Sequence, residues 1–243
     1  MKSTRRTAVI TGGVRRIGQL LAFTLAEQGF NLVLHYSRNS TETDKTIEVC
    51  ENFGAQVVPV QADFHFPEET KKVFEASKLL EEPAKVLINN AAIFEPVKFM
   101  ETSLEDWQSH QNINLTAPFL LTQLFARQLP EDQAGCIINI LDWRALRPGK
   151  DHFPYTISKA GLNALTKATA LALAPRISVN GIAFGAILPP SDGGEQSDSI
   201  LKNIPAWRWA DLDEVSQIVM FLINGPGYIT GEIIHLDGGR HLV

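Results

Sequence analysis

The sequence predicts an α/β protein with a doubly wound parallel sheet and helices on both of its faces. Short apolar segments alternate with longer amphipathic segments along the whole chain. Strands that are apolar on both sides are typical of parallel sheets covered by helices. Glycine follows two of the amphipathic segments, at Gly29 and Gly54, and glycine commonly ends helices. The 243 residues suffice for a single domain, 1–243, with one large core.

The first half of the chain supplies four predicted strands, over residues 7–10, 31–35, 56–61 and 85–89. A helix over 17–28 follows the first strand and another over 41–53 follows the second. A charged helix reaching about residue 80 follows the third. This alternation is the pattern of βαβ units, whose strands run parallel.

The second half continues the alternation, with strands over 136–141, 177–183 and 232–236. Apolar periodicity predicts a long helix over 104–129 and another that carries Tyr155 and extends to about residue 173. The last helix begins at Asp211, where Asp211 and Glu214 resemble a capping box with aspartate in place of serine or threonine.

The one irregular stretch begins at residue 188 and is rich in proline, glycine, serine and aspartate. A loop of this length in a compact domain is usually functional or disordered. We expect a substrate lid over about 188–210, against the alternative of a variable surface loop. Trp207 and Trp209 either line the substrate pocket or pack against the base of the lid.

Composition excludes several classes of protein. The net charge of −5, the pI of 5.7 and the lack of a Lys/Arg block argue against nucleic-acid binding. The sequence shows no signal peptide and no membrane span. Cys50 and Cys136 have no metal-ligand spacing, so we expect inert packing thiols, no metal site and a cytoplasmic location.

A glycine-rich turn joins the first strand to the first helix. It runs from Thr11 to Gly18, and its cofactor-binding candidates are Gly12, Arg16, Ile17 and Gly18. Glycines let the backbone approach a pyrophosphate, whose charge the helix N-terminus stabilises. The alternative is an ordinary glycine-rich turn between a strand and a helix.

The end of the second predicted strand favours NADP(H) over NAD(H). An acidic residue there would bind a ribose 2′-hydroxyl, but the segment after Tyr36 reads Ser37-Arg38-Asn39. Arg38 can pair with a 2′-phosphate, and Ser37 and Asn39 can donate to it. Asp63, after the third strand, either accepts from the adenine amino group or caps a helix.

Tyr155 and Lys159 are four residues apart on a predicted helix, so they share one face. An ammonium beside a phenol favours the phenolate, which predicts a lowered pKa for Tyr155 and a role in proton transfer. This pair alone is a weak signal.

These segments together resemble the short-chain dehydrogenase/reductase family along nearly the whole chain, with Asn90-Ala91, Asn114 and the closing Leu236-Asp237-Gly238-Gly239. The resemblance implies a Rossmann fold and a homotetramer. It also implies that Asn90, Ala91 and Gly185 lie beside the cofactor, that Asn114 holds a proton-relay water and that Lys159 holds the nicotinamide ribose.

Departures from the family pattern resemble one branch, the pteridine reductases and the bacterial dihydromonapterin reductases. Arg16 replaces a glycine, Asp142 stands where the family has a catalytic serine, Phe94 follows Ile93, and the second strand ends His35-Tyr36-x-Arg38. A further departure puts Phe184 where the family has proline, so that Phe184 either faces substrate or loosens its loop.

The chemistry of a pterin fits these departures. Its reacting C=N bond needs a proton on nitrogen, which Asp142 and Tyr155 can supply or orient. Phe94 can stack on the ring, and Arg16 can meet both cofactor phosphate and the pterin edge. Alternatively, Asp142 is a loop residue in an inactive protein, Phe94 is packing and Arg16 binds phosphate only.

The sequence thus predicts NADPH-dependent reduction of dihydromonapterin or a related dihydropterin, with weak activity on dihydrofolate. Two alternatives remain. One is a carbonyl reductase of the same family, acting on a 3-oxoacyl thioester or a sugar. The other is a non-catalytic module that binds NADPH.

Overall fold

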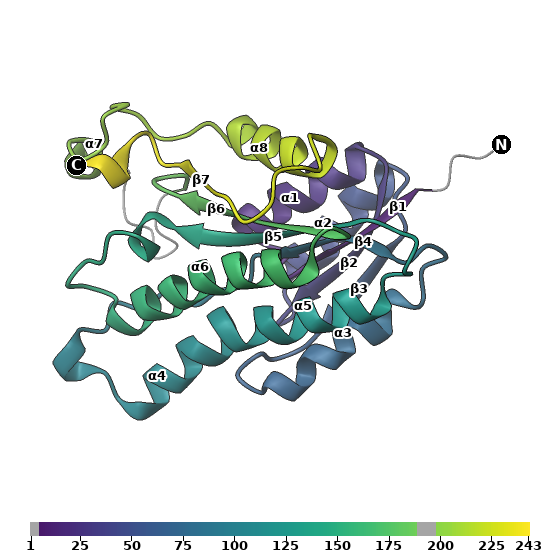
Figure 1. Cartoon of the computed structure of the whole chain (residues 1–243), viewed down its shortest axis with the longest axis horizontal. Coiled ribbons are helices and arrows are strands. Elements are labelled where there is room, and N and C mark those ends of the chain that lie inside the picture. Colours follow the sequence, from purple (N-terminus) through teal and green to yellow (C-terminus); the bar gives the residue numbers. More distant parts are fainter. Residues whose placement is uncertain (1–4, 189–197) are drawn as a thin grey trace.

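Seven parallel strands form one sheet in the order β3-β2-β1-β4-β5-β6-β7 in a computed structural model, which describes residues 5–188 and 198–243 (Figure 1). The predicted doubly wound parallel sheet is therefore confirmed. The strands are β1 Arg6–Ile10, β2 Phe30–Tyr36, β3 Val57–Gln61, β4 Ala84–Asn89, β5 Gly135–Asp142, β6 Ile177–Phe184 and β7 Ile233–Leu236.

Helices cover both faces of this sheet (Figure 1). On one face α1 packs between α2 and α8, and on the other α5 packs against α3 while α4 packs against α6. The helices are α1 Arg16–Glu27, α2 Thr41–Asn52, α3 Thr70–Ser77, α4 Leu104–Gln111, α5 Ala117–Gln128, α6 Phe153–Leu173, α7 Asp198–Leu201 and α8 Leu212–Asn224.

Two hydrophobic cores lie on the two faces of the sheet. One contains Leu21 and Leu25 of α1 with Leu34 of β2, and the other contains Phe74 of α3 and Phe125 of α5. Successive strand residues point to opposite faces, so β1 to β6 each contribute to both cores, whereas β7 contributes Ile234 and Leu236 to the core that contains Leu21. This explains why the strands read as continuous apolar segments.

The long helix expected over 104–129 is interrupted. α4 and α5 are separated by a π-helical turn over Asn112–Thr116. Apolar periodicity does not report a single wide turn, which is why the sequence suggested one helix. Such turns often occur at functional sites, and this one carries Asn114.

Cys50 and Cys136 are both buried, as expected of packing thiols. Burial raises the pKa of Cys50 to about 12 and that of Cys136 to about 11, so both thiols stay protonated at neutral pH. Within 5–188 and 198–243, no helix combines the length and apolar character needed to cross a bilayer.

Gly18, at the start of α1, lies close to the backbone of the glycine-rich turn. A Cβ atom there would collide with the carbonyl oxygen of Gly12 in the preceding turn. The turn and the helix can therefore pack only if residue 18 has no side chain.

We predict that Gly18→Ala lowers the free energy of unfolding by about 1–3 kcal/mol, because the added methyl group overpacks the turn. Thermal denaturation measures the change. Gly227→Ala is the matched control, since a Cβ at Gly227 would meet nothing within 4 Å. Equal melting temperatures for the two variants would contradict the prediction.

Candidate active site

The carboxyl ends of the parallel strands gather the predicted site residues at one edge of the sheet. Asp142 is the last residue of β5, Asn89 ends β4 and Phe184 ends β6. The glycine-rich turn follows β1 at the same edge. In open α/β sheets, ligands bind in the crevice outside these strand ends.

A groove of about 650 Å³ opens along this edge between the loops that follow β1, β2, β3 and β4. Most of the predicted cofactor-binding residues line it: Gly12, Arg16, Ile17, Gly18, Ser37, Arg38, Asp63, Asn90 and Ala91. Asn39, Tyr155, Lys159 and Gly185 are not among the lining residues. The oxygen of the Asn39 amide instead accepts from the backbone N–H of Ser40 at 2.9 Å.

The glycine turn fits a phosphate-bearing cofactor because its backbone lies open to the groove. Gly12 has a φ of 60°, and a Cβ there would meet the Cα of Ala91 at 3.1 Å. The Asn90 amide donates to the carbonyl oxygens of Thr11 and Gly12 at 2.9 and 3.1 Å. The turn is thus held open at the N-terminus of α1, where an anion is stabilised.

Arg16 occupies a left-handed conformation, with φ of 50°, where the family commonly has glycine. A non-glycine residue in this region carries backbone strain of about 1–3 kcal/mol, and such strain concentrates at functional sites. Its exposed guanidinium lines the groove. The geometry keeps Arg16 as a candidate for both cofactor and substrate.

Ser37 and Arg38 are exposed at the rim of the groove after β2. Asp63 lies across from them after β3, where its Oδ1 accepts from the His65 backbone N–H at 3.0 Å and from the His65 ring at 2.8 Å. Asp63 therefore has a local structural role in addition to the predicted adenine contact.

The three catalytic candidates on β5 and α6 come together. The Tyr155 hydroxyl donates to Oδ2 of Asp142 at 3.3 Å, and the Lys159 ammonium donates to the carbonyl oxygen of Ile140 at 2.7 Å. Lys159 Nζ is 5.8 Å from the centre of the Tyr155 ring. Tyr155 is 6% exposed and Lys159 is 2% exposed, so both polar groups are shielded from water.

The expected lowering of the Tyr155 pKa is wrong. Burial, followed by the negative charge of Asp142, raises the pKa of Tyr155 well above its usual value, because both disfavour a phenolate. Burial also raises the pKa of Asp142 and lowers that of Lys159 to about 8. Tyr155 is therefore a protonated phenol at neutral pH, which suits a proton donor.

Asn114 is fully buried in the π-helical turn. Its side-chain oxygen accepts from the Ile93 backbone N–H at 2.9 Å, and its amide donates to Ser158 Oγ at 3.0 Å. The side chain thus ties the loop after β4 to the catalytic helix α6. The role of Asn114 in holding a proton-relay water stays a prediction.

Phe94 lies half-exposed beside the catalytic residues. Its ring stacks on His152 with centroids 3.9 Å apart and an angle of 8° between the planes, and its ring meets Tyr155 edge-on at 4.7 Å. One face of Phe94 is therefore covered by His152. The edge-on contact places Phe94 against the ring of Tyr155, the predicted proton donor.

Sequence reasoning missed the support around Asp142 and Phe94. Arg144 donates its backbone N–H to Asp142 at 2.8 Å and its guanidinium to Asp151 at 3.2 Å. The His152 ring lies 3.1 Å from Asp151, and its backbone is left-handed with φ of 51°. Asp151 and His152 belong to no motif that includes the predicted catalytic residues, so the sequence did not point to them. Arg144 was the one member of this group whose position, two residues after Asp142, suggested a place near the site.

Arg240 also approaches the loop that follows Asp142, because its guanidinium lies 4.4 Å from the centre of the Trp143 ring. Arg144 contacts the same ring at 4.7 Å. Burial lowers the pKa of Arg240, and the charge of Arg144 adds to this effect. The C-terminal segment of the chain therefore packs against the catalytic loop.

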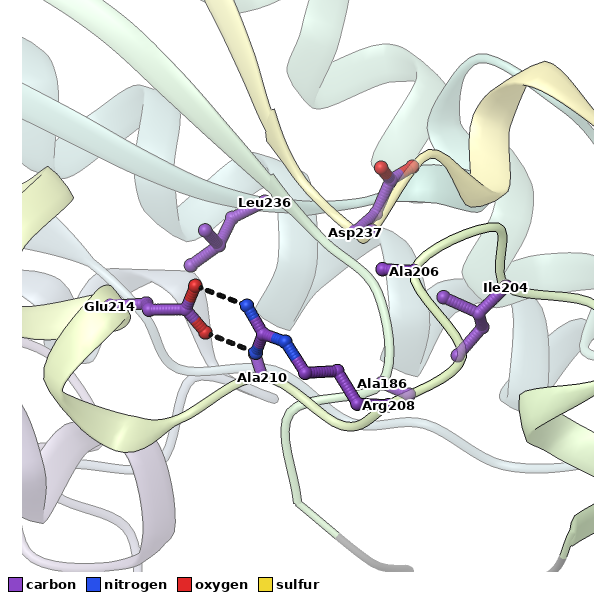
Figure 2. A pocket seen from close by; sticks show the side chains of 9 residues that line it. Ala186, Ile204, Ala206, Arg208, Ala210, Glu214, Leu236 and Asp237 are labelled. Carbon is purple, nitrogen blue, oxygen red and sulfur yellow. Dashed lines mark hydrogen bonds and ion pairs between the residues drawn. The ribbon is translucent and has the colours of Figure 1, made fainter.

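Part of the predicted lid, residues 189–197, lies outside the described residues. Figure 2 shows a pocket of about 70 Å³ that is lined in part by the segment after these residues. Within its lining, the Arg208 guanidinium donates to both carboxylate oxygens of Glu214 of α8, at 2.7 and 2.8 Å. Glu214 also accepts from the Asp211 backbone N–H at 2.8 Å, which is the return half of the predicted capping box. The segment from Arg208 to Asp211 is thus attached to the first turn of α8.

Trp207 and Trp209 do not line the large groove. Trp207 is 69% exposed, with φ of 54°.

The Phe184 side chain is buried in the core, so it does not face substrate. Gly185 packs against Asp237, since a Cβ there would lie 2.6 Å from the Asp237 Cα atom.

Comparison with known proteins matches this fold and site to one family. A family described as Enoyl-(Acyl carrier protein) reductase matches residues 12–241. Among curated relatives, 3-oxoacyl-[acyl-carrier-protein] reductase of Synechocystis is 32% identical over 97% of both chains. The FabG enzyme of the same name from Aquifex aeolicus is 32% identical over 98% of both chains.

Solved structures give a second group of relatives. FolM alternative dihydrofolate reductase 1 from Brucella canis, complexed with NADP, is 34% identical with a TM-score of 0.88, covering 98% of this chain and 95% of that one. The Brucella suis protein, also with NADP, is 33% identical with a TM-score of 0.91, covering 98% and 96%. The chain belongs to the short-chain dehydrogenase/reductase family and is an NAD(P)-dependent reductase.

Proposed function

We propose that this protein reduces a dihydropterin ring, dihydromonapterin or a close relative, with NADPH, and reduces dihydrofolate weakly. The observation that carries the proposal is the 3.3 Å hydrogen bond from the Tyr155 hydroxyl to Asp142. When a ring nitrogen takes the Tyr155 proton, this hydrogen bond must break, and protonated Asp142 can then return a proton to the phenol oxygen; burial raises the pKa of Asp142, which favours that form. In its ionised form Asp142 is poorly suited to a substrate carbonyl oxygen, because a carboxylate accepts hydrogen bonds and cannot donate one.

NADP(H) is the cofactor. The groove accommodates a dinucleotide, its glycine turn is open at the N-terminus of α1, and Arg38 at its rim can pair with a 2′-phosphate. The similar FolM structures were determined with NADP, which supports the same conclusion. Gly12, Ile17, Gly18, Asn90 and Ala91 would lie along the bound nucleotide.

The bound nicotinamide would supply a hydride to the ring. Tyr155 holds the proton for the ring nitrogen, since burial keeps its phenol protonated. Once that proton has moved to the ring nitrogen, protonated Asp142 can replace it on the phenol oxygen, and Lys159, held by the Ile140 carbonyl, supplies positive charge near the Tyr155 ring. Phe94, which is half-exposed and has the Arg144 guanidinium 5.4 Å from the centre of its ring, contacts the pterin, and Arg16 contacts the pterin edge.

A second candidate is reduction of a 3-oxoacyl thioester, which the names of the curated relatives favour. Those enzymes belong to a family whose catalytic serine hydrogen-bonds the substrate carbonyl. This chain has no serine between Ser109 and Ser158. The replacement of that serine by Asp142 is why we rank this candidate second.

A homotetramer in the cytoplasm is part of the proposal. The family assembles through the helix that carries Tyr155, here α6. On this helix Leu162 belongs to the core, whereas Ile157 is 38% exposed and Leu171 is 85% exposed. These exposed apolar side chains are available for contact with another subunit.

We predict that Asp142→Ser lowers kcat/KM for a dihydropterin by about 10²- to 10⁴-fold, the range expected for loss of positioned acid–base catalysis. The serine keeps a hydroxyl that can accept from the Arg144 N–H, so the fold should persist. The same variant should gain activity on a 3-oxoacyl thioester. Steady-state NADPH oxidation measures both, with Asp142→Asn as the control for charge alone.

The opposite result would be an Asp142→Ser enzyme with unchanged dihydropterin kinetics. Asp142 would then be a loop residue without a part in the reaction. Unchanged dihydropterin kinetics together with high thioester activity in the native protein would favour the second candidate.

We predict an alkaline fall in kcat/KM as pH rises through about 8, because Lys159, whose pKa is about 8, loses its charge there. Tyr155 cannot cause this fall, since its pKa is raised far above that range. The charge of Asp142 raises the pKa of Lys159, so the fall should move to lower pH in Asp142→Asn. An inflection that stays at the same pH in the variant would contradict the assignment.

We predict that Arg38→Asp lowers the ratio of kcat/KM for NADPH to that for NADH by about 10- to 100-fold, the equivalent of one or two charge-assisted hydrogen bonds. Arg127→Asp, in the last turn of α5, is the control for a change of two charge units. A preserved preference for NADPH in Arg38→Asp would show that another residue binds the 2′-phosphate.

A further inference from the structure

His35 is a buried polar residue in the wall of the cofactor groove. It lies on β2, the strand between β1 and β3, and is 2% exposed. Its ring stacks on Phe64 with centroids 3.9 Å apart and an angle of 9° between the planes. The reaction described above does not use this side chain.

Both ring nitrogens of His35 have a partner. The Gly12 backbone N–H donates to Nδ1 at 3.1 Å, and Nε2 lies 2.9 Å from the carbonyl oxygen of Ala62. A carbonyl oxygen only accepts, so Nε2 must carry the proton, and a backbone N–H only donates, so Nδ1 must be free of one. The two contacts together permit a single form, the neutral Nε2–H tautomer.

The two partners of this ring lie on the segments that follow β1 and β3, and both segments contribute lining residues to the groove. Gly12 begins the glycine turn after β1, and Ala62 immediately precedes Asp63, which lines the groove after β3. The backbone reinforces the first connection, because the Gly13 N–H donates to the His35 carbonyl oxygen at 2.9 Å. One side chain therefore connects the glycine turn with the segment after β3.

The neutral form matters for what His35 can do. Burial lowers the pKa of His35 to about 4, although the Ala62 carbonyl and the charge of Asp63 oppose this effect. An uncharged ring does not attract the phosphates of a nucleotide. Its influence on binding must therefore come from the position of the backbone that it holds.

We propose that His35 is a positioning residue for NADP(H), which in its Nε2–H tautomer sets the distance and angle between the glycine turn and the loop after β3. The hydrogen bond from Gly12 is the one that fixes the turn against the phosphates. The hydrogen bond to Ala62 chiefly anchors the ring. The inference requires that the groove binds NADP(H), but it does not depend on a pterin substrate.

Two variants separate these hydrogen bonds. In His35→Asn the amide oxygen takes the place of Nδ1 and can still accept from Gly12, whereas in His35→Gln the amide nitrogen takes the place of Nε2 and can still donate to Ala62. Each variant loses one bond of the ring and the stacking on Phe64, so both should have a similarly lowered melting temperature. The dissociation constant for NADPH should separate them.

We expect the dissociation constant, measured by fluorescence titration with NADPH, to stay within about threefold of the native value in His35→Asn. In His35→Gln it should rise by about tenfold, the effect of one lost hydrogen bond on a preorganised site. His110→Asn is the control for a buried histidine outside the groove, where the ring contacts the Asp106 carbonyl at 2.7 Å. It should lose stability and keep its affinity for NADPH.

Equal dissociation constants for His35→Asn and His35→Gln, with equally lowered melting temperatures, would show that His35 is only structural. Should either variant not fold, nitrogen-15 NMR of the native protein with labelled histidine gives an independent test. A protonated Nε2 and an unprotonated Nδ1, with and without NADP, are the expected result. A proton on Nδ1 would overturn the proposal, and a native protein that does not bind NADPH would overturn the cofactor assignment as well.

Discussion

The parallel direction of all seven strands is the constraint on which the site depends. Because every strand runs the same way, the loops that follow β1, β2, β3 and β4 meet at one edge and enclose the groove. The same edge receives Asp142 from β5, and α6 packs over it so that Tyr155 reaches that carboxyl group. The candidate active site is therefore formed by segments that are far apart in the sequence, and no single segment contains all of its residues.

Burial then determines the protonation states at this edge. The low-dielectric surroundings disfavour charge on Tyr155, Asp142 and Lys159 alike, and their pKa values move accordingly. The result is a protonated Tyr155 phenol that is hydrogen-bonded to the Asp142 carboxyl group. Nearby lies Lys159, whose pKa of about 8 is close to neutral pH. A reductase needs a proton to deliver, so these shifts agree with the direction of the proposed reaction.

The sequence predicted the sheet, the order of its elements and most of the groove, because these follow from apolar periodicity and glycine placement. It did not predict the π-helical turn at Asn114, since one wide turn leaves the apolar pattern unchanged. It gave the wrong direction for the Tyr155 pKa, because spacing reveals a neighbouring ammonium but not the degree of burial or the contact of Lys159 with the Ile140 carbonyl. The stacking of His152 on Phe94 involves a left-handed backbone conformation at His152, and the sequence contains no pattern that predicts this conformation.

The central claim is that Asp142 and Tyr155 serve reduction of a pterin ring. Its most direct test is to follow NADPH absorbance while the purified native protein is offered dihydromonapterin, dihydrobiopterin, dihydrofolate and a 3-oxoacyl thioester in separate reactions. We predict oxidation of NADPH with the dihydropterins, weak oxidation with dihydrofolate and none with the thioester. Oxidation with the thioester alone would contradict the claim and assign the protein to carbonyl reduction.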